Sequence, residues 1–219
     1  GEKKVLNAQA FAEKLKNTPG ALVLDVRTVE EFAGGHLEKA VNVDWNGNGF
    51  EVWSQKIDKD ASIFVYCLSG GRSAQAAEML RKEGFQVTEL QGGYLKWTTK
   101  LKPLEGVPSV SHDQAWDLSA FGKLIQGENA VVVDFYAKWC APCLKMMPTV
   151  DKLSNDYKGK VTVLKVEADG NQAVLQKYEI DEIPSFLVFQ KGKLLQKTSG
   201  FREEAQLKEL FDQSIGTIR

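Results

Sequence analysis

The sequence predicts a two-domain α/β protein, with a parallel sheet in its first half. The chain has 219 residues, which suits two cores of about 100 residues each. Short apolar runs alternate with amphipathic stretches, which is the pattern of strands and crossover helices. The stretch LKPLEGVPSVSHD, at 101–113, has two prolines, a glycine and two serines without apolar periodicity, and this indicates a linker. We therefore expect domains at 1–101 and 113–219, joined by a linker at 102–112.

In the first half, the segment around Cys67 predicts a strand, a glycine-rich loop and a helix in succession. The helix shows an apolar stripe at helical spacing, and Gly84 stands where a helix usually stops. Cys67 is thereby placed at the carboxyl end of a strand, where open α/β sheets bind ligands. The predicted strands are ALVLDV (21–26), AVNVD (40–44) and SIFVYC (62–67), and the predicted helix is SAQAAEMLRKEG (73–84).

The second half shows the same alternation and ends in a strand pair followed by a helix. A turn at Lys191-Gly192 separates the paired strands. The predicted helices lie near 113–125, 141–156, 171–178 and 202–214, and the predicted strands are AVVVDFYA (130–137), VTVLKVEA (161–168), PSFLVFQ and KLLQKTSG.

Composition excludes several classes of function. The 28 basic and 29 acidic residues give a formal charge of −1, which offers no footprint for nucleic acid or anionic lipid. No apolar run approaches the roughly 18 residues that span a bilayer. The three cysteines have no histidine near them at zinc-ligand spacing, so we expect no metal and no cofactor. We expect a monomer. The chain begins with Gly1, which favours a processed protein of the bacterial periplasm or cell envelope, with the cytoplasm as the alternative.

The motif KWCAPC, at 138–143, follows a predicted strand and begins a predicted helix. Helix N-terminal amides stabilise a thiolate, so the pKa of Cys140 should fall and Cys140 should be the nucleophile. Cys143 is one helical turn away, where it can resolve a mixed disulfide on Cys140. Two structural cysteines, or half of a metal site, are the alternative. Asp134 lies in the apolar run VVVDFYA. Burial there should raise its pKa and let it relay a proton to or from Cys143, unless it faces outward.

The second half resembles thioredoxin, from about 109 to 219. The resemblance implies a thioredoxin fold with a mixed sheet and a reducing disulfide pair. It also implies a cis Ile183-Pro184 peptide that faces the cysteine pair and binds substrate chains beside Trp139, and a Lys165 that tunes Asp134. From the residues alone, Pro184 is only a proline that starts a strand. Many thioredoxins have glycine at the position of Ala141. The matching residues are VDFYAKWCAPC (133–143), Pro148, Lys165, EIPSF (182–186) and Gly200.

The loop CLSGGRS, at 67–73, suits an anion. Its two glycines allow backbone amides to turn inward as a nest, and the following helix adds its own N-terminal amides. A thiolate or persulfide on Cys67 would be stabilised there, and Arg72 could position an incoming oxyanion by a bidentate contact. The alternative is a buried cysteine that acts as a small hydrophobe.

The first half resembles a single-domain rhodanese. The resemblance implies that Cys67 accepts sulfur and that Leu68, Ser69, Gly70 and Gly71 form the cradle with Arg72. Four residues separate Cys67 from Arg72, whereas related dual-specificity phosphatases have five, so the loop suits sulfur better than phosphate. Asp25 and Arg27 look structural, and His36 looks like a turn residue bonded to backbone. The matching stretches are LDVRTVEEFAGGHLEKAVNV (24–43), VYCLSGGRS (65–73) and GGYLKW (92–97).

Together the two halves indicate a sulfurtransferase fused to its own reductant. Cys67 would take sulfur from thiosulfate or a similar sulfane-sulfur donor, and the Cys140 and Cys143 dithiol would release it as sulfide. The alternative is a general protein disulfide reductase whose first half is a binding or sensing module. Either function needs disulfide or small-thiol substrates and an electron donor, which is a thioredoxin reductase or a membrane thiol relay.

Overall fold

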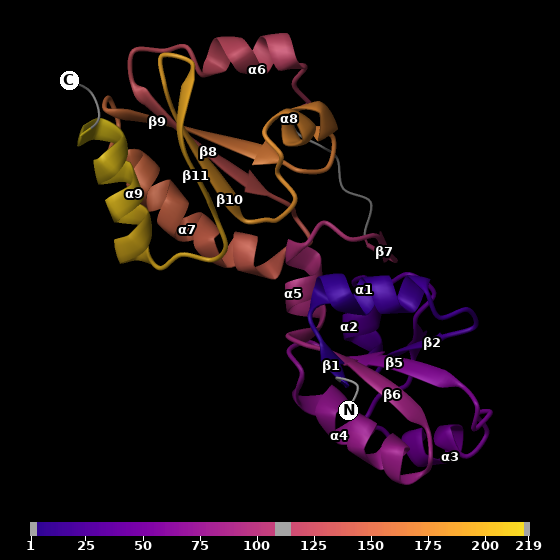
Figure 1. Cartoon of the computed structure of the whole chain (residues 1–219). Coiled ribbons are helices and arrows are strands. Elements are labelled where there is room, and N and C mark those ends of the chain that lie inside the picture. The colour runs from indigo at the N-terminus through magenta and orange to yellow at the C-terminus, as the bar shows by residue number, and fades with distance from the viewer. Residues whose placement is uncertain (1–3, 108–114, 217–219) are drawn as a thin grey trace. The chain divides into compact units, whose positions relative to one another are not determined.

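The computed structural model describes residues 4–107 and 115–216. The chain divides into two compact units, 1–109 and 110–219 (Figure 1). The start of the expected linker, at 102–107, belongs to the first unit, because β7 (Leu104–Glu105) pairs antiparallel with β3 (His36–Leu37). The backbone N–H of Lys39 also donates to the Glu105 carboxylate at 3.1 Å. The rest of the expected linker, at 108–112, lies outside the described residues.

The first unit contains a sheet of parallel strands in the order β1-β6-β5-β2-β4, which confirms the expected parallel sheet. The strand β5, which leads into Cys67, lies at its centre. The strands are β1 (Val5–Leu6), β2 (Leu22–Asp25), β4 (Val41–Asn42), β5 (Ser62–Tyr66) and β6 (Gln86–Leu90), and the helices are α1 (Ala8–Lys16), α2 (Val29–Ala33), α3 (Phe50–Ser54), α4 (Gly71–Lys82) and α5 (Gly93–Thr99).

Successive residues of β5 face opposite sides of this sheet, as a strand requires. Ile63 and Val65 pack in one apolar cluster with residues of α3 and α4, whereas Phe64 and Tyr66 pack in another with residues of α1 and α5. Because both faces are covered, the strand reads as a continuous apolar run rather than an alternating one.

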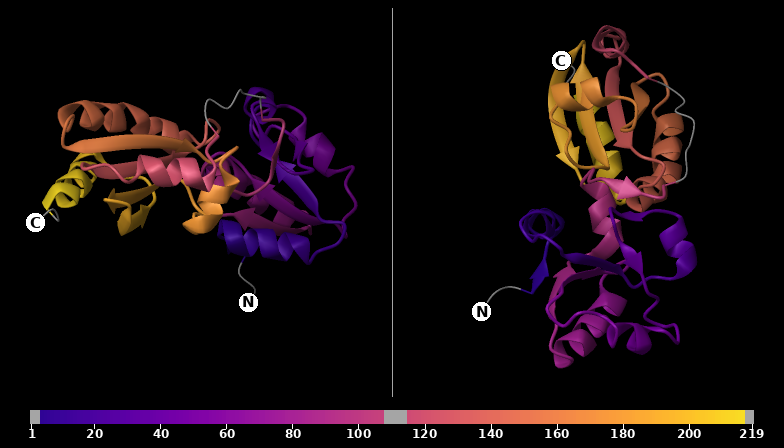
Figure 2. Two further views of the ribbon diagram at one scale, coloured as in Figure 1. Left: turned by 90° about the horizontal axis from the view of Figure 1, so that it is seen from above. Right: turned by 90° about the vertical axis from the view of Figure 1, so that its right-hand side faces the viewer.

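The second unit contains a mixed sheet in the order β11-β10-β8-β9. β8 and β9 are parallel, and β10 is antiparallel to both β8 and β11. Helices α7 and α9 pack on one face, and Phe121 and Tyr178 pack against Phe189 on the other, so helices flank the sheet (Figure 2). The elements are β8 (Ala130–Tyr136), β9 (Val161–Glu167), β10 (Ser185–Gln190), β11 (Lys193–Ser199), α6 (Leu118–Leu124), α7 (Ala141–Asp156), α8 (Gln172–Lys177) and α9 (Glu204–Gly216).

Pro148 lies inside α7, as the sequence indicates. Within residues 4–107 and 115–216, no helix combines the length and the apolar character needed to cross a membrane.

A buried polar network joins the strand ends of the first unit. The Arg27 guanidinium, which is 2% exposed, donates to Asp25 at 2.6 Å and to the Gly35 carbonyl at 2.7 Å. Burial raises the pKa of the Tyr66 phenol, which stays protonated and donates to Asp25 at 2.6 Å. The Tyr66 hydroxyl in turn accepts the Leu37 backbone N–H at 3.1 Å. Asp25 and Arg27 are structural, as expected.

His36 lies in the short strand β3 and not in a turn, but it is bonded to backbone as expected. Its Nδ1 lies 3.0 Å from the Phe32 carbonyl oxygen, and its ring stacks on the Phe32 ring. The His36 ring is thereby held by the end of α2.

We predict that Asp25→Asn destabilises the first unit by about 3–5 kcal/mol, because it leaves a buried guanidinium without its counter-charge. The measurement is urea unfolding followed by hydrogen exchange and mass spectrometry of peptides from residues 4–107. Asp60→Asn is the matched control, since Asp60 is exposed and its change should stay within about 0.5 kcal/mol. Equal unfolding midpoints for the two variants would contradict the structural role of Asp25.

Candidate active sites

Cys67 follows directly after β5, at the carboxyl end of the parallel sheet, and α4 begins at Gly71. Gly70 has φ +121°, a conformation that side-chain-bearing residues rarely adopt. The glycine therefore lets the chain turn sharply from the strand into the helix, which brings backbone amides around the sulfur.

The Cys67 sulfur is buried and surrounded by hydrogen-bond partners. It accepts the Gly70 backbone N–H at 3.1 Å, and the Ser73 hydroxyl lies 3.3 Å away. Burial raises the pKa of the thiol, but hydrogen bonds from the Ser73 side chain and from the amides of Ser73, Gly70 and Ser69 outweigh burial, so the net pKa is lowered. These groups favour an anion at Cys67.

The N-terminus of α5 fixes the loop from outside. The backbone N–H of Tyr94 donates to the Cys67 carbonyl at 2.8 Å, and that of Leu95 donates to the Leu68 carbonyl at 3.1 Å. In a trans peptide the carbonyl and the next N–H point in opposite directions, so binding the Leu68 carbonyl here directs the Ser69 amide toward the sulfur. Gly93 allows this approach, since a Cβ at that position would lie 2.5 Å from the Cys67 oxygen.

Arg72 lies beside this loop, but its guanidinium is already engaged. It forms a bidentate pair with Glu31, with Nη1 at 2.7 Å from Oε1 and Nη2 at 3.0 Å from Oε2. The sequence predicts that Arg72 binds an incoming oxyanion in a bidentate contact. It did not identify Glu31 as the partner of Arg72. The sequence separation of 41 residues hides this partner.

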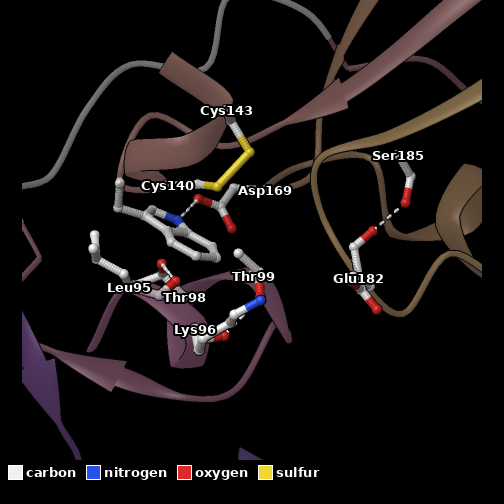
Figure 3. Close-up of a disulfide and its surroundings, with 10 residues drawn as sticks. Leu95, Lys96, Thr98, Thr99, Cys140, Cys143, Asp169, Glu182 and Ser185 are labelled. Atoms are coloured by element: carbon white, nitrogen blue, oxygen red, sulfur yellow. Dashed lines mark hydrogen bonds between the residues drawn. A yellow bond between two sulfur atoms is a disulfide. The ribbon is translucent and has the colours of Figure 1, made fainter. Parts of the chain in front are cut away.

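Cys140 and Cys143 form a disulfide at the start of α7 (Figure 3). Cys140 is the N-cap residue of the helix, and Ala141 and Pro142 lie in its first turn. The first cysteine therefore lies at the positive end of the helix dipole, where a thiolate is stabilised after reduction.

Trp139 precedes the cysteine pair and is held by a residue that the sequence analysis missed. Its indole N–H donates to the Asp169 carboxylate at 2.7 Å. Asp169 follows the end of β9, which is parallel to and paired with β8. Because parallel strands end at the same edge of a sheet, the position of Asp169 after a strand was the signal that could have found it.

The Ile183-Pro184 peptide is cis, as expected. Ser185 begins β10 and lies opposite Phe135 near the end of β8. The cis peptide therefore approaches the edge of the sheet from which Cys140 follows.

The other residues that the sequence predicts to bind substrate lie in the first unit, in the loop after Cys67. They are Leu68, Ser69, Gly70 and Gly71.

Asp134 lies on β8 and is 3% exposed. Burial raises its pKa to about 7, although the positive charge of Lys165 lowers it and the charge of Asp151 raises it further. Lys165 is the β9 residue opposite Asp134 in the strand register, and its ammonium group pairs with Asp151. A carboxyl group with this pKa can both accept and donate a proton near neutral pH.

The second unit has the fold and the dithiol of a thiol-disulfide oxidoreductase. Thioredoxins of Staphylococcus aureus are 38% identical to this chain over 84 residues, which is 38% of this chain and 81% of theirs. The family model described as Thioredoxin matches residues 114–213, and the one described as Rhodanese-like domain matches 7–100. The chain belongs to the thioredoxin family through its second half and has a rhodanese-like domain in its first half, so the expected fusion is confirmed.

A solved chain from work on the thiol resolving mechanism in yeast mitochondrial 1-Cys peroxiredoxin, via glutathione/thioredoxin systems, is 29% identical to this chain. It covers 44% of this chain and 90% of its own length, with a TM-score of 0.42.

We predict that Ser73→Ala raises the pKa of Cys67 by about one pH unit, because it removes one hydrogen bond to the thiolate. The pKa is measured from thiolate absorbance against pH in a Cys140→Ser, Cys143→Ser background, where Cys67 is the remaining thiol. Ser69→Ala is the control, since only the backbone amide of Ser69 acts on the sulfur. A Ser73→Ala curve that overlays the Ser69→Ala curve would exclude the hydroxyl as a thiolate donor.

We predict that the second unit loses stability as pH rises from about 4 to about 7. The folded-state pKa of Asp134 is raised to about 7 from the ordinary 3.8, so its contribution is complete below the unfolded pKa and is lost as the buried carboxyl ionises. The loss is on the order of 4 kcal/mol. Asp134→Asn should abolish this pH-dependent loss of stability, because asparagine does not ionise. The measurement is urea unfolding of the oxidised protein at pH 4 and pH 8, followed by exchange in peptides from 115–216.

The exposed Asp156→Asn serves as the control for Asp134→Asn. It should keep the pH dependence of the parent chain. If Asp134→Asn also keeps that dependence, ionisation of Asp134 is not the cause.

Proposed function

We propose that the chain is a sulfurtransferase in which Cys67 forms a persulfide and the Cys140 and Cys143 dithiol reduces it to sulfide. The observation that carries this proposal is the set of hydrogen-bonding groups around Cys67, in which the Gly70 amide donates to the sulfur at 3.1 Å and the Ser73 hydroxyl oxygen lies 3.3 Å from it. Donors in this arrangement stabilise a thiolate before attack and a persulfide anion afterwards.

In the first step, the Cys67 thiolate attacks the outer sulfur of a sulfane-sulfur donor such as thiosulfate. A bond forms between Cys67 and that sulfur, the sulfur–sulfur bond of thiosulfate breaks, and its electron pair leaves with sulfite. The product is a Cys67 persulfide. Ser73 suits both states of the sulfur, because its hydroxyl donates to the Gly70 carbonyl when Cys67 is a thiol and can turn toward the sulfur when it is an anion.

In the second step, the Cys140 thiolate attacks the outer sulfur of the persulfide. This frees the Cys67 thiolate and leaves a persulfide on Cys140. Cys143 then attacks the inner sulfur of Cys140, a disulfide forms and hydrosulfide leaves. The two electrons that reduce sulfane sulfur to sulfide come from the dithiol, and the product disulfide is the one seen in the structure.

Asp134 is the proposed proton acceptor for the Cys143 thiol. With a pKa of about 7, it is divided between its two protonation states near neutral pH, so it can take the proton and later return it. Lys165 supports the ionised state by its charge.

The proposed partners follow from this cycle. The dithiol must be regenerated by a reductase or a membrane thiol relay, and it also suits protein disulfides and small disulfides as substrates. Because both cysteine sites belong to one chain, the dithiol is present at a raised effective concentration relative to Cys67.

A second candidate is a general protein disulfide reductase with a binding or sensing first unit. The second unit favours this candidate, because it contains by itself the groups proposed for disulfide reduction. These are the cysteine pair, the cis peptide before Pro184 and the buried Asp134. In that function Cys67 gains no sulfur, which separates the two candidates.

We predict that the reduced full-length protein, treated with thiosulfate or with glutathione persulfide, gains about 32 Da on Cys67 when Cys140 and Cys143 are both replaced by serine. With both cysteines present, it should instead release one hydrosulfide per chain and form the Cys140 and Cys143 disulfide. Intact-mass and peptide mass spectrometry measure the first result, and a sulfide assay measures the second.

Cys67→Ser is the decisive variant for this pathway. It should slow donor-dependent oxidation of the dithiol to the uncatalysed background while leaving reduction of insulin disulfides intact, which also shows that the second unit is folded. Oxidation of the dithiol at the parent rate in Cys67→Ser would overturn the sulfur relay in favour of the second candidate.

A further inference from the structure

The side chain that neutralises Arg72 is fixed from two directions. Glu31 lies in the first turn of α2, where Thr28 and Glu31 form a capping box. Its Oε1 accepts the Thr28 backbone N–H at 3.2 Å, while both carboxylate oxygens accept from Arg72. Because the Thr28 N–H already orients the Glu31 side chain, the bidentate pair with Arg72 costs little additional side-chain entropy.

The charges of this pair persist over the whole physiological range of pH. The Arg72 hydrogen bond lowers the pKa of Glu31 to about 2, against the opposing effect of burial, and Thr28 lowers it further. The Glu31 carboxylate therefore remains ionised wherever the Cys67 thiolate exists.

The balance of charge beside Cys67 is consequently not positive. Arg72 is the only basic residue in CLSGGRS, and its guanidinium group is paired with the Glu31 carboxylate. The hydrogen bond to Glu31 is the main cause of the raised pKa of Arg72, and the negative charges of Glu31, Cys67 and Asp44 raise it further against the effect of burial. Within the described part of this loop, a dianion that enters meets an Arg72 guanidinium that is already paired with the Glu31 carboxylate.

We infer that Glu31 determines the donor class, so that Cys67 takes its sulfur from an organic persulfide in preference to the dianion thiosulfate. This inference rests on the proposed function of Cys67. Attack on a neutral persulfide, RS–SH, forms the bond from Cys67 to the outer sulfur, breaks the RS–S bond and expels RS⁻. That leaving group has a single charge and the ordinary pKa of a thiol, about 8.5, so it does not require a bidentate cation. Thiosulfate enters as a dianion and releases sulfite as a dianion, and binding these oxyanions would use a guanidinium that is not already paired.

The test compares two donors on the full chain with Cys140→Ser and Cys143→Ser, so that sulfur accumulates on Cys67. The probes are thiosulfate and glutathione persulfide at equal concentration, and the rate of gain of about 32 Da is followed by intact mass. Cys67→Ser in the same background locates the added sulfur. We expect glutathione persulfide to load Cys67 at least about tenfold faster than thiosulfate, since the oxyanion lacks its charge-assisted partner.

Glu31→Gln is the informative substitution. The amide oxygen of glutamine can still accept the Thr28 backbone N–H, so the end of α2 is kept, while the negative charge is lost and Arg72 becomes available for the sulfonate oxygens. We expect the ratio of the thiosulfate rate to the persulfide rate to rise roughly tenfold. Glu30→Gln is the matched control, because Glu30 is the exposed neighbour on the same helix and should leave the ratio unchanged.

The outcomes separate this inference from the function on which it rests. If neither donor adds sulfur to Cys67, the proposed sulfurtransferase function fails. If thiosulfate loads Cys67 as fast as glutathione persulfide, or if Glu31→Gln gives the same ratio as Glu30→Gln, the function stands and the role of Glu31 is wrong.

Discussion

The buried pair of Asp25 and Arg27 is the interaction on which the geometry around Cys67 depends. Asp25 accepts the hydroxyl of Tyr66, the residue immediately before Cys67. The Arg27 guanidinium lies 4.1 Å from the centre of the Tyr94 ring, and the Tyr94 backbone N–H holds the Cys67 carbonyl. The same ion pair is thus in contact with the strand that presents the cysteine and with the helix that closes its loop. A buried pair of this kind tolerates loss of neither partner.

Both cysteine sites use the junction between a strand and a helix, but they differ in how the anion is stabilised. Cys67 lies inside a loop whose amides converge on one sulfur, which suits stabilisation of an anion on that sulfur. Cys140 is itself the N-cap of α7 and has its partner thiol one turn away, which suits formation of a disulfide. Each unit also has a carboxyl group whose pKa is strongly shifted, and the two shifts are in opposite directions. Burial raises the pKa of Asp134 to about 7, while Arg72 lowers that of Glu31 to about 2. One is suited to proton transfer and the other to a permanent charge.

Most strands and helices of the two sheets could be predicted from the local sequence pattern. Apolar runs indicate buried strands, and amphipathic stretches that end at glycine indicate helices. Three features could not be predicted in this way. The pairing of β7 with β3 ties part of the apparent linker to the first unit. Gly93 lies 26 residues after Cys67 in the chain and lets the N-terminus of α5 approach the cysteine loop. Glu31 occupies Arg72 across 41 residues. Each depends on segments that meet only after folding.

By itself the sequence determined that the chain has two α/β halves, that a cysteine follows a strand in each of them, and that one site is a single thiol while the other is a dithiol. Residue type and spacing are sufficient for this, since a sulfur after a strand and before a helix is exposed to free amides whatever else surrounds it. The tertiary structure alone decided which charges the sulfur meets. Arg72 is a free oxyanion ligand in the sequence and the partner of Glu31 in the fold, because electrostatic interactions depend on distance in space and not on separation along the chain.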